Sequence, residues 1–190
     1  MLLYMIRHGE SEANRARKFA GWLPVPLSEK GEQQARAAGE KLRGVAFEKI
    51  YASDLRRAVQ TCELALPGCE YETTPLLREY NVGTVGGKSP EECTAEYGET
   101  YTQAIARLDM TPFGGETHEG HRQRVAEFFS QVEKLDAQTV AAFSHFGTMR
   151  AALENVLDAP WVKGRILCDN CCIAVLAFEN GVWMLKDWNK

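Results

Sequence analysis

The sequence lacks the long apolar stretches that mark membrane proteins and secreted precursors. Its first apolar run, residues 1–6, ends at Arg7 and is shorter than the ~7–15 apolar residues at the centre of a signal peptide. No other segment approaches the ~20 apolar residues of a membrane-spanning helix. We therefore expect a cytoplasmic protein that has no membrane partner.

A surplus of positive charge is also missing. The 22 lysines and arginines are outnumbered by 26 aspartates and glutamates, which leaves a formal net charge of −4 over 190 residues. This balance argues against a nucleic-acid partner, because such proteins carry a basic face. Any anion that this protein binds must be met by a local cluster of cationic side chains.

The cysteines and histidines do not form a zinc-binding pattern. Three of the six cysteines lie in CDNCC at 168–172, where a Cys-x-x-Cys pair could be half of a zinc site or a redox pair. A zinc site needs about four ligands, and no second Cys/His pair has suitable spacing. The alternative is that Cys171 and Cys172 begin an apolar strand and pack as small hydrophobic residues. We interpret His118 and His121 as an exposed helix start and expect no metal site.

Apolar periodicity alternates between the patterns of strands and helices along the chain. Strands are predicted at residues 2–6, 47–52, 139–143, 173–178 and 182–185, with a hairpin turn at Asn180-Gly181. Helices are predicted at residues 28–43, 55–66, 91–107 and 147–157, and around the apolar face of Val125, Phe128, Phe129 and Val132. The alternation predicts one α/β domain over residues 1–190, with a mainly parallel β-sheet flanked by helices on both faces.

Cationic side chains and histidines follow three of the predicted strands. Arg7 and His8 follow the first strand, Arg57 lies about one turn into the helix after the second, and His145 follows the third. Because ligands of open α/β sheets bind beyond the carboxyl ends of the strands, these four groups are expected to meet. Guanidinium groups match phosphate oxygens, and a neutral histidine is a nucleophile. The arrangement predicts a phosphate site.

Four motifs extend this pattern: RHGE at 7–10 with Asn14, SDLRRAVQT at 53–61, LRE at 77–79 and SHFG at 144–147. With these motifs in this order, the chain resembles the histidine phosphatases of the phosphoglycerate mutase superfamily from residue 4 to about residue 176. The resemblance implies that His8 takes the phosphoryl group and that Glu79 protonates the leaving oxygen. It also implies a phosphate-binding set around His8 that consists of Arg7, Arg57, Asn14 and His145.

Several residues allow a second interpretation. Arg56 competes with Arg57, although the family pattern favours the arginine directly before Ala58. Glu79 could simply pair with Arg78, and His145 could be a histidine of the core. Expected in the substrate pocket are Ser11, Trp22, Tyr80 and Phe146. Departures from the family pattern at Pro24, Val85, Gly86 and Phe146 bear on the shape of the pocket, so the substrate of other members does not transfer.

Three functions remain open at this point. The first is a phosphatase that hydrolyses a small phosphorylated metabolite without a metal or other cofactor. The second is a phosphoglycerate mutase that depends on bisphosphoglycerate, to which KFAGW at 18–22 is similar. The third is a phosphate-binding regulatory module with weak or no catalysis. The interval between Glu79 and His145 is shorter than in mutases of the family, which favours hydrolysis. A homodimer is left open.

Overall fold

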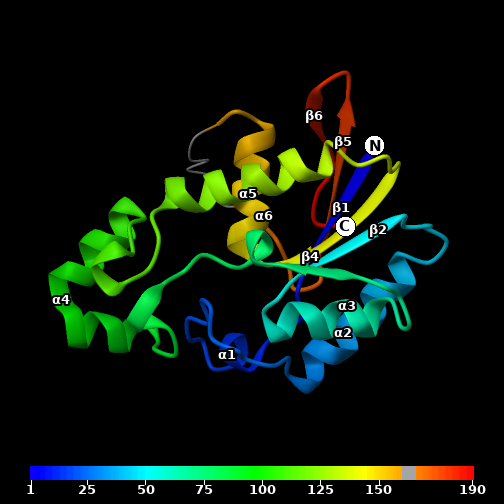
Figure 1. Cartoon of the computed structure of the whole chain (residues 1–190). Helices are drawn as coiled ribbons and strands as arrows, with labels where there is room; N and C mark the ends of the chain where they lie inside the picture. The colour runs from blue at the N-terminus through cyan, green and yellow to red at the C-terminus, as the bar shows by residue number, and fades with distance from the viewer. Residues whose placement is uncertain (160–165) are drawn as a thin grey trace.

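A six-stranded sheet forms the centre of the computed structural model, which describes residues 1–159 and 166–190. The strand order is β3-β2-β4-β1-β5-β6 (Figure 1). The strands are β1 Leu2–Arg7, β2 Lys49–Ser53, β3 Glu72–Thr74, β4 Thr139–Ser144, β5 Ile173–Glu179 and β6 Val182–Asp187. Strands β1 to β4 pair in parallel, β5 is antiparallel to β1, and β6 is antiparallel to β5. The predicted mainly parallel sheet is confirmed.

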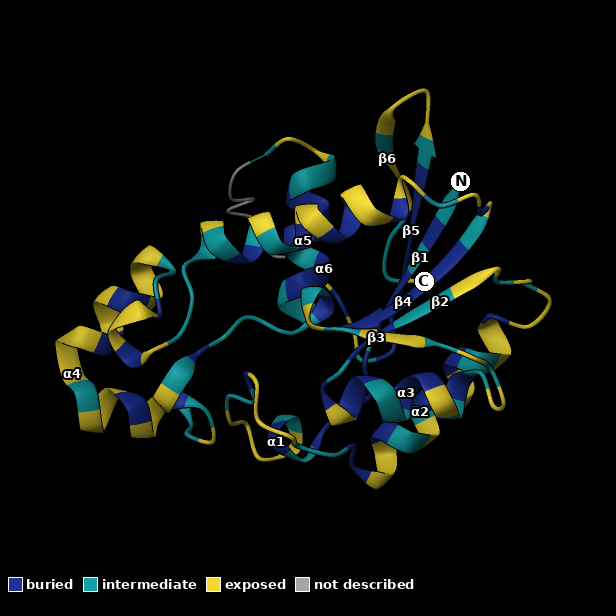
Figure 2. Cartoon of the chain, in the orientation of Figure 1, coloured by how far each residue is buried: buried dark blue, intermediate teal, exposed yellow. Residues whose placement is uncertain are grey.

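Helices cover both faces of this sheet, as predicted (Figures 1 and 2). Helices α2 (Glu29–Lys41) and α3 (Arg56–Ala65) lie on one face, and α5 (His118–Val132) and α6 (Phe146–Val156) on the other. Alternate residues of β1 serve the two cores: Leu3 joins the core under α5 and α6, and Ile6 joins the core under α2 and α3. No helix in the described ranges has the length and apolar character to cross a bilayer.

The turns and helix starts follow the local chemistry of the sequence. Ser28 is the N-cap of α2, where its side chain accepts a hydrogen bond from the backbone N–H of Gly31. Thr117 caps α5 in the same manner. Asn180 and Gly181 both have positive φ, at 52° and 79°, which is what a two-residue hairpin turn requires. The predicted cap at Ser28 and the hairpin are confirmed.

The sequence prediction was wrong at three short elements. Strand β2 begins at Lys49, two residues later than predicted, because Phe47 instead packs edge-on against the ring of Tyr4. Strand β3 was not predicted, since its exposed polar residues show no apolar alternation. Helix α1 (Glu12–Arg15) was not predicted either. It is a single turn that depends on a reciprocal cap between Ser11 and Asn14.

Helix α4 (Pro90–Arg107) lies away from the sheet, at the left of Figure 1. It is broken at Gly98, whose φ of 53° and ψ of −126° are not helical. The 3₁₀ helices of the structure are Pro75–Leu77, Gly83–Val85 and Thr111–Phe113. Together with α4, the last two build a small satellite core, which consists of Val82, Val85, Cys93, Tyr101, Ala104, Met110 and Phe113. This core holds one side of the cavity described below.

The turn after β1 lies directly against the start of α2. Ser28 donates its backbone N–H to the carbonyl oxygen of Glu10 at 2.8 Å. A Cβ atom at Gly31 would lie only 1.9 Å from that same carbonyl oxygen. The absence of a side chain at Gly31 therefore lets α2 press the turn that follows His8 into place.

We expect Gly31→Ala to lower the free energy of unfolding by about 1–3 kcal/mol, because the added methyl group must push two backbone segments apart. Denaturant unfolding measures this change. The matched control is Gln33→Ala, an exposed position on the same helix, which should alter stability by less than about 0.5 kcal/mol. Equal stability of the two variants would show that the space between Gly31 and the carbonyl oxygen of Glu10 can accept a methyl group without cost.

Candidate active site

A cavity of about 320 Å³ lies at the carboxyl ends of the parallel strands. Several elements contribute to it: the turn after β1, the start of α3, the segment after the first 3₁₀ helix, and the starts of α5 and α6. The predicted site residues that line it are Arg7, His8, Asn14, Arg57, Glu79, Tyr80 and Phe146. The edge of the sheet thus brings together residues that are far apart in the sequence.

His8 is buried, and its hydrogen bonds define its tautomer. Its Nδ1 lies 2.6 Å from the carbonyl oxygen of Gly9, which can only accept, so Nδ1 carries the proton. The lone pair is then on Nε2, which accepts from Nε of Arg57 at 3.3 Å. Burial, reinforced by Arg57 and Arg7, holds the pKa of His8 well below its ordinary value of 6.5. His8 therefore presents a neutral, nucleophilic Nε2.

Arg57 is a cation with no exposure to solvent. Its two terminal nitrogens donate to the carbonyl oxygens of Gly21 and Leu23, at 2.9 and 3.3 Å. Burial lowers the pKa of Arg57 to about 10, so the side chain is still charged at neutral pH. Its neighbour Arg56 is exposed. The structure therefore places Arg57 in the cavity and leaves Arg56 facing solvent.

His145 is fully buried and is not among the residues that line the cavity, but its ring lies against that of His8, with the two ring centroids 5.1 Å apart. Its Nε2 lies 2.8 Å from Oγ of Ser53. Among the hydrogen bonds of the described residues, Nε2 of His145 is the only acceptor available to the hydrogen of that hydroxyl group, which also accepts from the backbone N–H of Leu55, so we assign the hydroxyl hydrogen to Nε2. Nδ1 of His145 then carries a proton. Burial is the largest cause that holds the pKa of His145 well below 6.5.

Arg7 is held from both its backbone and its side chain. Its backbone N–H donates to the carbonyl oxygen of Cys172 at 3.1 Å, and its Nη1 donates to the carbonyl oxygen of Cys168. The guanidinium group lies 5.5 Å from the centroid of the Phe146 ring, within the range of a cation–π contact. Neither of these carbonyl oxygens accepts a hydrogen bond from Nε of Arg7.

Two buried side-chain nitrogen atoms in the described part of the chain have no hydrogen-bond partner, and both belong to residues of this site. They are Nε of Arg7 and Nδ1 of His145, and both are N–H donors in the states assigned above. Buried donors are nearly always paired in folded proteins, so an unpaired one calls for an explanation. Two such donors beside the charge of Arg57 are suited to an anion with several oxygens, such as a phosphoryl group.

Glu79 reaches the cavity from the segment that follows the first 3₁₀ helix. Its Oε1 accepts from the backbone N–H of Tyr80 at 2.8 Å. A Cβ atom at Gly147 would lie 2.3 Å from the same oxygen, so the start of α6 closely confines the carboxylate. The alternative pairing with Arg78 is absent, because Arg78 forms a two-pronged ion pair with Asp54.

The structure does not place Ser11 and Trp22 in the cavity wall. Ser11 is fully buried. Its hydroxyl group caps α1, and its backbone N–H donates to the side chain of Asn14. Trp22 instead stacks on Arg78 at 4.6 Å and donates its indole N–H to the carbonyl oxygen of Glu79 at 2.7 Å. Both residues support the site from outside.

The interpretation of His118 and His121 as exposed was wrong for His121, which is 2% exposed. Thr148 donates its hydroxyl hydrogen to the carbonyl oxygen of Arg78, so its Oγ1 accepts from Nε2 of His121 at 3.1 Å. His118 pairs through Nε2 with the buried carboxylate of Glu154 at 2.7 Å. Both histidines line the cavity. Local sequence could not reveal this, because their partners come from distant elements.

Burial of His8, His121 and His145 makes folding stability depend on pH. Burial is the largest cause of the lowered pKa of each. The unfolded chain takes up a proton on each near pH 6.5, whereas the folded chain resists it. Their contribution is therefore complete above pH 6.5 and is lost as the pH falls below it, by about 1.4 kcal/mol per pH unit for each histidine.

The cysteines of CDNCC are all buried thiols. Sγ of Cys168 lies 2.9 Å from Sγ of Cys172, four residues away, while Cys171 packs with Leu27 and Ala35 under α2. Burial contributes to raising the pKa of Cys171 to about 12, which makes this thiol unreactive. No group of three or more His, Cys, Asp or Glu suited to a metal ion occurs in residues 1–159 and 166–190.

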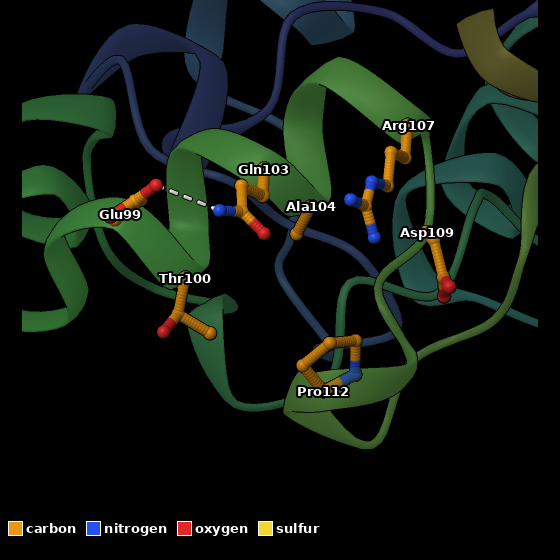
Figure 3. Close-up of a pocket in the computed structure, with 7 residues that line it drawn as sticks. All are labelled: Glu99, Thr100, Gln103, Ala104, Arg107, Asp109 and Pro112. Atoms are coloured by element: carbon orange, nitrogen blue, oxygen red, sulfur yellow. Dashed lines mark hydrogen bonds between the residues drawn. The ribbon is translucent and has the colours of Figure 1, made fainter.

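A second cavity of about 230 Å³ lies along α4 and the segment that follows it (Figure 3). One of its sides carries a hydrogen bond between the side chains of Gln103 and Glu99 at 2.8 Å. Arg107, Asp109 and Pro112 form its other side. It shares no lining residue with the cavity around His8 and contains neither of the unpaired buried donors.

Comparison with known proteins supports the same chemistry. A chain from Gloeobacter violaceus, named 2,3-bisphosphoglycerate-dependent phosphoglycerate mutase 2, is 37% identical over 161 residues, which cover 80% of this chain and 74% of that protein. The solved alpha-ribazole phosphatase from Shigella flexneri is 26% identical, with a TM-score of 0.91 over 100% of this chain and 96% of that chain.

A solved mycobacterial glucosyl-3-phosphoglycerate phosphatase is 27% identical, with a TM-score of 0.85 over 99% of this chain and 98% of that chain. Similar proteins thus carry names of both phosphatases and mutases. Residues 3–190 match the histidine phosphatase superfamily, branch 1. With the match extending over nearly the whole sequence and the phosphate-binding geometry described above, this chain belongs to the histidine phosphatase superfamily.

Proposed function

We propose that the protein is a metal-independent phosphatase that hydrolyses small phosphomonoesters through a phosphohistidine on His8. The observation that carries this proposal is the pair of unpaired buried donors, on Arg7 and His145, beside a histidine whose Nε2 bears a lone pair. An incoming phosphoryl group satisfies both donors. We place this activity in the cytoplasm.

In the first step, Nε2 of His8 forms a bond to phosphorus while the bond from phosphorus to the ester oxygen breaks. Negative charge spreads over the three remaining phosphoryl oxygens, which makes fixed donors effective catalysts. Arg7, Arg57 and His145 supply these donors, and the two arginines supply the positive charge that a metal ion would otherwise provide. Glu79 in its protonated form gives a proton to the leaving oxygen.

In the second step, water attacks phosphorus and the bond to Nε2 breaks. Glu79, now a carboxylate, takes a proton from that water, so phosphate is released and His8 returns to its neutral form. Splitting the reaction at an intermediate replaces one difficult step with two easier ones. A regulatory module that only binds phosphate would not need the carboxyl group of Glu79 at this position. Its presence therefore supports a catalytic function.

A phosphoglycerate mutase is the second candidate, favoured by the name of the Gloeobacter violaceus relative. A mutase must protect the phosphohistidine from water until its product is rephosphorylated, which is the purpose of a lid. Here α4 directs its buried residues Cys93, Tyr101 and Ala104 into the satellite core. This use of the helix as part of a fixed wall supports hydrolysis.

We expect His8→Asn to lower kcat/KM by at least about 10³-fold, because the nucleophile is lost. Asparagine keeps a donor for the carbonyl oxygen of Gly9, so the fold should persist. Rapid-quench labelling with a ³²P-phosphomonoester should give an acid-labile, alkali-stable phosphoenzyme with the native protein only. The exposed Arg56→Ala variant is the control and should behave as native. An acid-stable adduct would contradict the proposal.

Glu79→Gln should slow alkyl phosphates by about 10²–10⁴-fold and p-nitrophenyl phosphate far less, since only a basic leaving oxygen needs a proton. The glutamine carbonyl can still accept from the backbone N–H of Tyr80. Gly147→Ala should give the same pattern without changing an ionisable group, because its methyl group displaces the carboxyl group. Steady-state kinetics on both ester types measures this. Equal losses on both would indicate a structural role for Glu79.

With 3-phosphoglycerate and catalytic 2,3-bisphosphoglycerate, we expect phosphate release to exceed formation of 2-phosphoglycerate. The reason is that α4 is packed as part of a fixed wall, so it is not free to close over a phosphohistidine and shield it from water. Phosphorus-31 NMR follows both products in one sample. Interconversion much faster than release would replace the phosphatase proposal with the mutase.

A further inference from the structure

The phosphate-binding groups occupy only one part of the 320 Å³ cavity around His8, and the remainder has a largely apolar lining. We propose that the alcohol released from the substrate is apolar and of moderate size, and that it binds between Phe146 and the wall formed by the satellite core and α4. This inference rests on the phosphatase function proposed above and names the class of ester that the site selects. Phosphate esters of glycerate and of other small polar alcohols should then bind poorly and be poor substrates.

The apolar wall comes from a region that is separate from the main sheet. Val82 and Met110 line the cavity and at the same time belong to the satellite core. Ile105 and Leu108, at the end of α4, line it beside them. Since this wall has a packed core of its own behind it, it presents a preformed apolar surface and does not depend on a ligand for its shape.

Ile105 is 39% exposed although it is a large aliphatic residue. A single exposed apolar side chain is common on protein surfaces, but this one lines a concave site in company with Leu108 and Phe19. Contact with an apolar ligand would remove this surface from water, which is favourable in proportion to its area. Binding of an apolar alcohol against Ile105 would account for the exposure of this side chain in the free protein.

Phe146 closes the cavity from the opposite element, α6. Its ring contacts the guanidinium group of Arg7, 5.5 Å away, and also lines the cavity. Tyr80 lines the cavity too, and its ring lies 5.5 Å from that of His121. The groups next to the phosphate site are therefore aromatic, and they would contact the first atoms of the alcohol beyond the ester oxygen.

The two cations at the outer part of the cavity, Lys18 and Arg150, already interact with carboxylates. Nε of Arg150 binds Oε1 of Glu154 at 3.1 Å, and Glu154 is fully buried. Removing Arg150 from this pair to bind a substrate carboxylate would weaken the compensation of a buried charge, which is costly. Lys18 lies 3.3 Å from Glu92. This pairing favours an apolar alcohol over a second anionic group.

The cavity also limits the size of the alcohol. Small-molecule sites usually enclose about 300–1,000 Å³, so 320 Å³ lies at the lower end of that range. Part of this volume must hold the phosphoryl group. An alcohol with a single ring or a short branched chain suits what remains.

The test uses non-hydrolysable n-alkyl phosphonates from methyl to hexyl, whose phosphorus groups are alike and whose apolar surface grows by methylene groups. Titration calorimetry on the whole protein gives each Kd, and the matching alkyl phosphates give each kcat/KM. Each buried methylene is worth about 0.8 kcal/mol, so we expect Kd to fall about fourfold per added methylene until the cavity is filled. 3-Phosphoglycerate should be hydrolysed more slowly than butyl phosphate.

Ile105→Gln and Leu108→Asn should reduce this gradient to below about twofold per methylene. Asparagine suits Leu108 because its φ is 53° and asparagine tolerates the left-handed region. The control is Val182→Thr, which alters an apolar side chain that is 59% exposed on β6 and does not line the cavity. Thermal unfolding of each variant verifies the fold.

The outcomes separate this inference from the function on which it rests. A Kd that does not change along the phosphonate series, with esters still hydrolysed, would overturn the apolar pocket and leave the phosphatase intact. A clear gradient in Kd without hydrolysis of any ester would overturn the phosphatase and leave the apolar pocket. A gradient that survives unchanged in Ile105→Gln and Leu108→Asn would overturn the assignment of the wall.

Discussion

The site depends on a guanidinium group that is held out of water beside an imidazole. Arg57 has no solvent exposure, and its Nε lies 3.3 Å from Nε2 of His8. Burial, reinforced by this charge, lowers the pKa of His8 and keeps it neutral, because protonation would bury a second cation in contact with the first. A neutral histidine next to fixed positive charge is what attack on an anionic ester requires, since the charge draws in the phosphoryl group and leaves the lone pair available.

Burying Arg57 would be costly if its donors were unmatched, and much of the neighbouring structure serves to match them. The carbonyl oxygens of Gly21 and Leu23 accept from its terminal nitrogens. Thr61 accepts from the backbone N–H of Gly9 and donates to the carbonyl oxygen of Arg57, so α3 and the turn after β1 are joined at this point. Three segments that are distant in the sequence are thereby fixed around one charge.

The cavity divides the work between two structural units. The sheet edge carries the groups to which we assign recognition of the phosphoryl group. The satellite core and α4 carry the outer wall, where Ile105 and Leu108 line the cavity. Chains with this fold carry the names of an alpha-ribazole phosphatase and a glucosyl-3-phosphoglycerate phosphatase. A constant inner end and a changeable outer wall would allow one fold to act on unlike alcohols.

Sequence by itself determined five of the six strands, the main helices, and the grouping of His8 and Arg57 at one edge of the sheet. Apolar periodicity and caps act over a few residues, and parallel strands necessarily end at one edge, so His8 and Arg57 could be placed together in advance. Only the tertiary structure decided that Ser11 caps a helix outside the cavity, that His121 is buried in its wall, and that Ile105 faces the site. The cap itself is local, because it joins Ser11 to Asn14. The burial of His121 and the positions of Ser11 and Ile105 relative to the cavity depend on contacts between elements tens of residues apart, which local pattern does not encode.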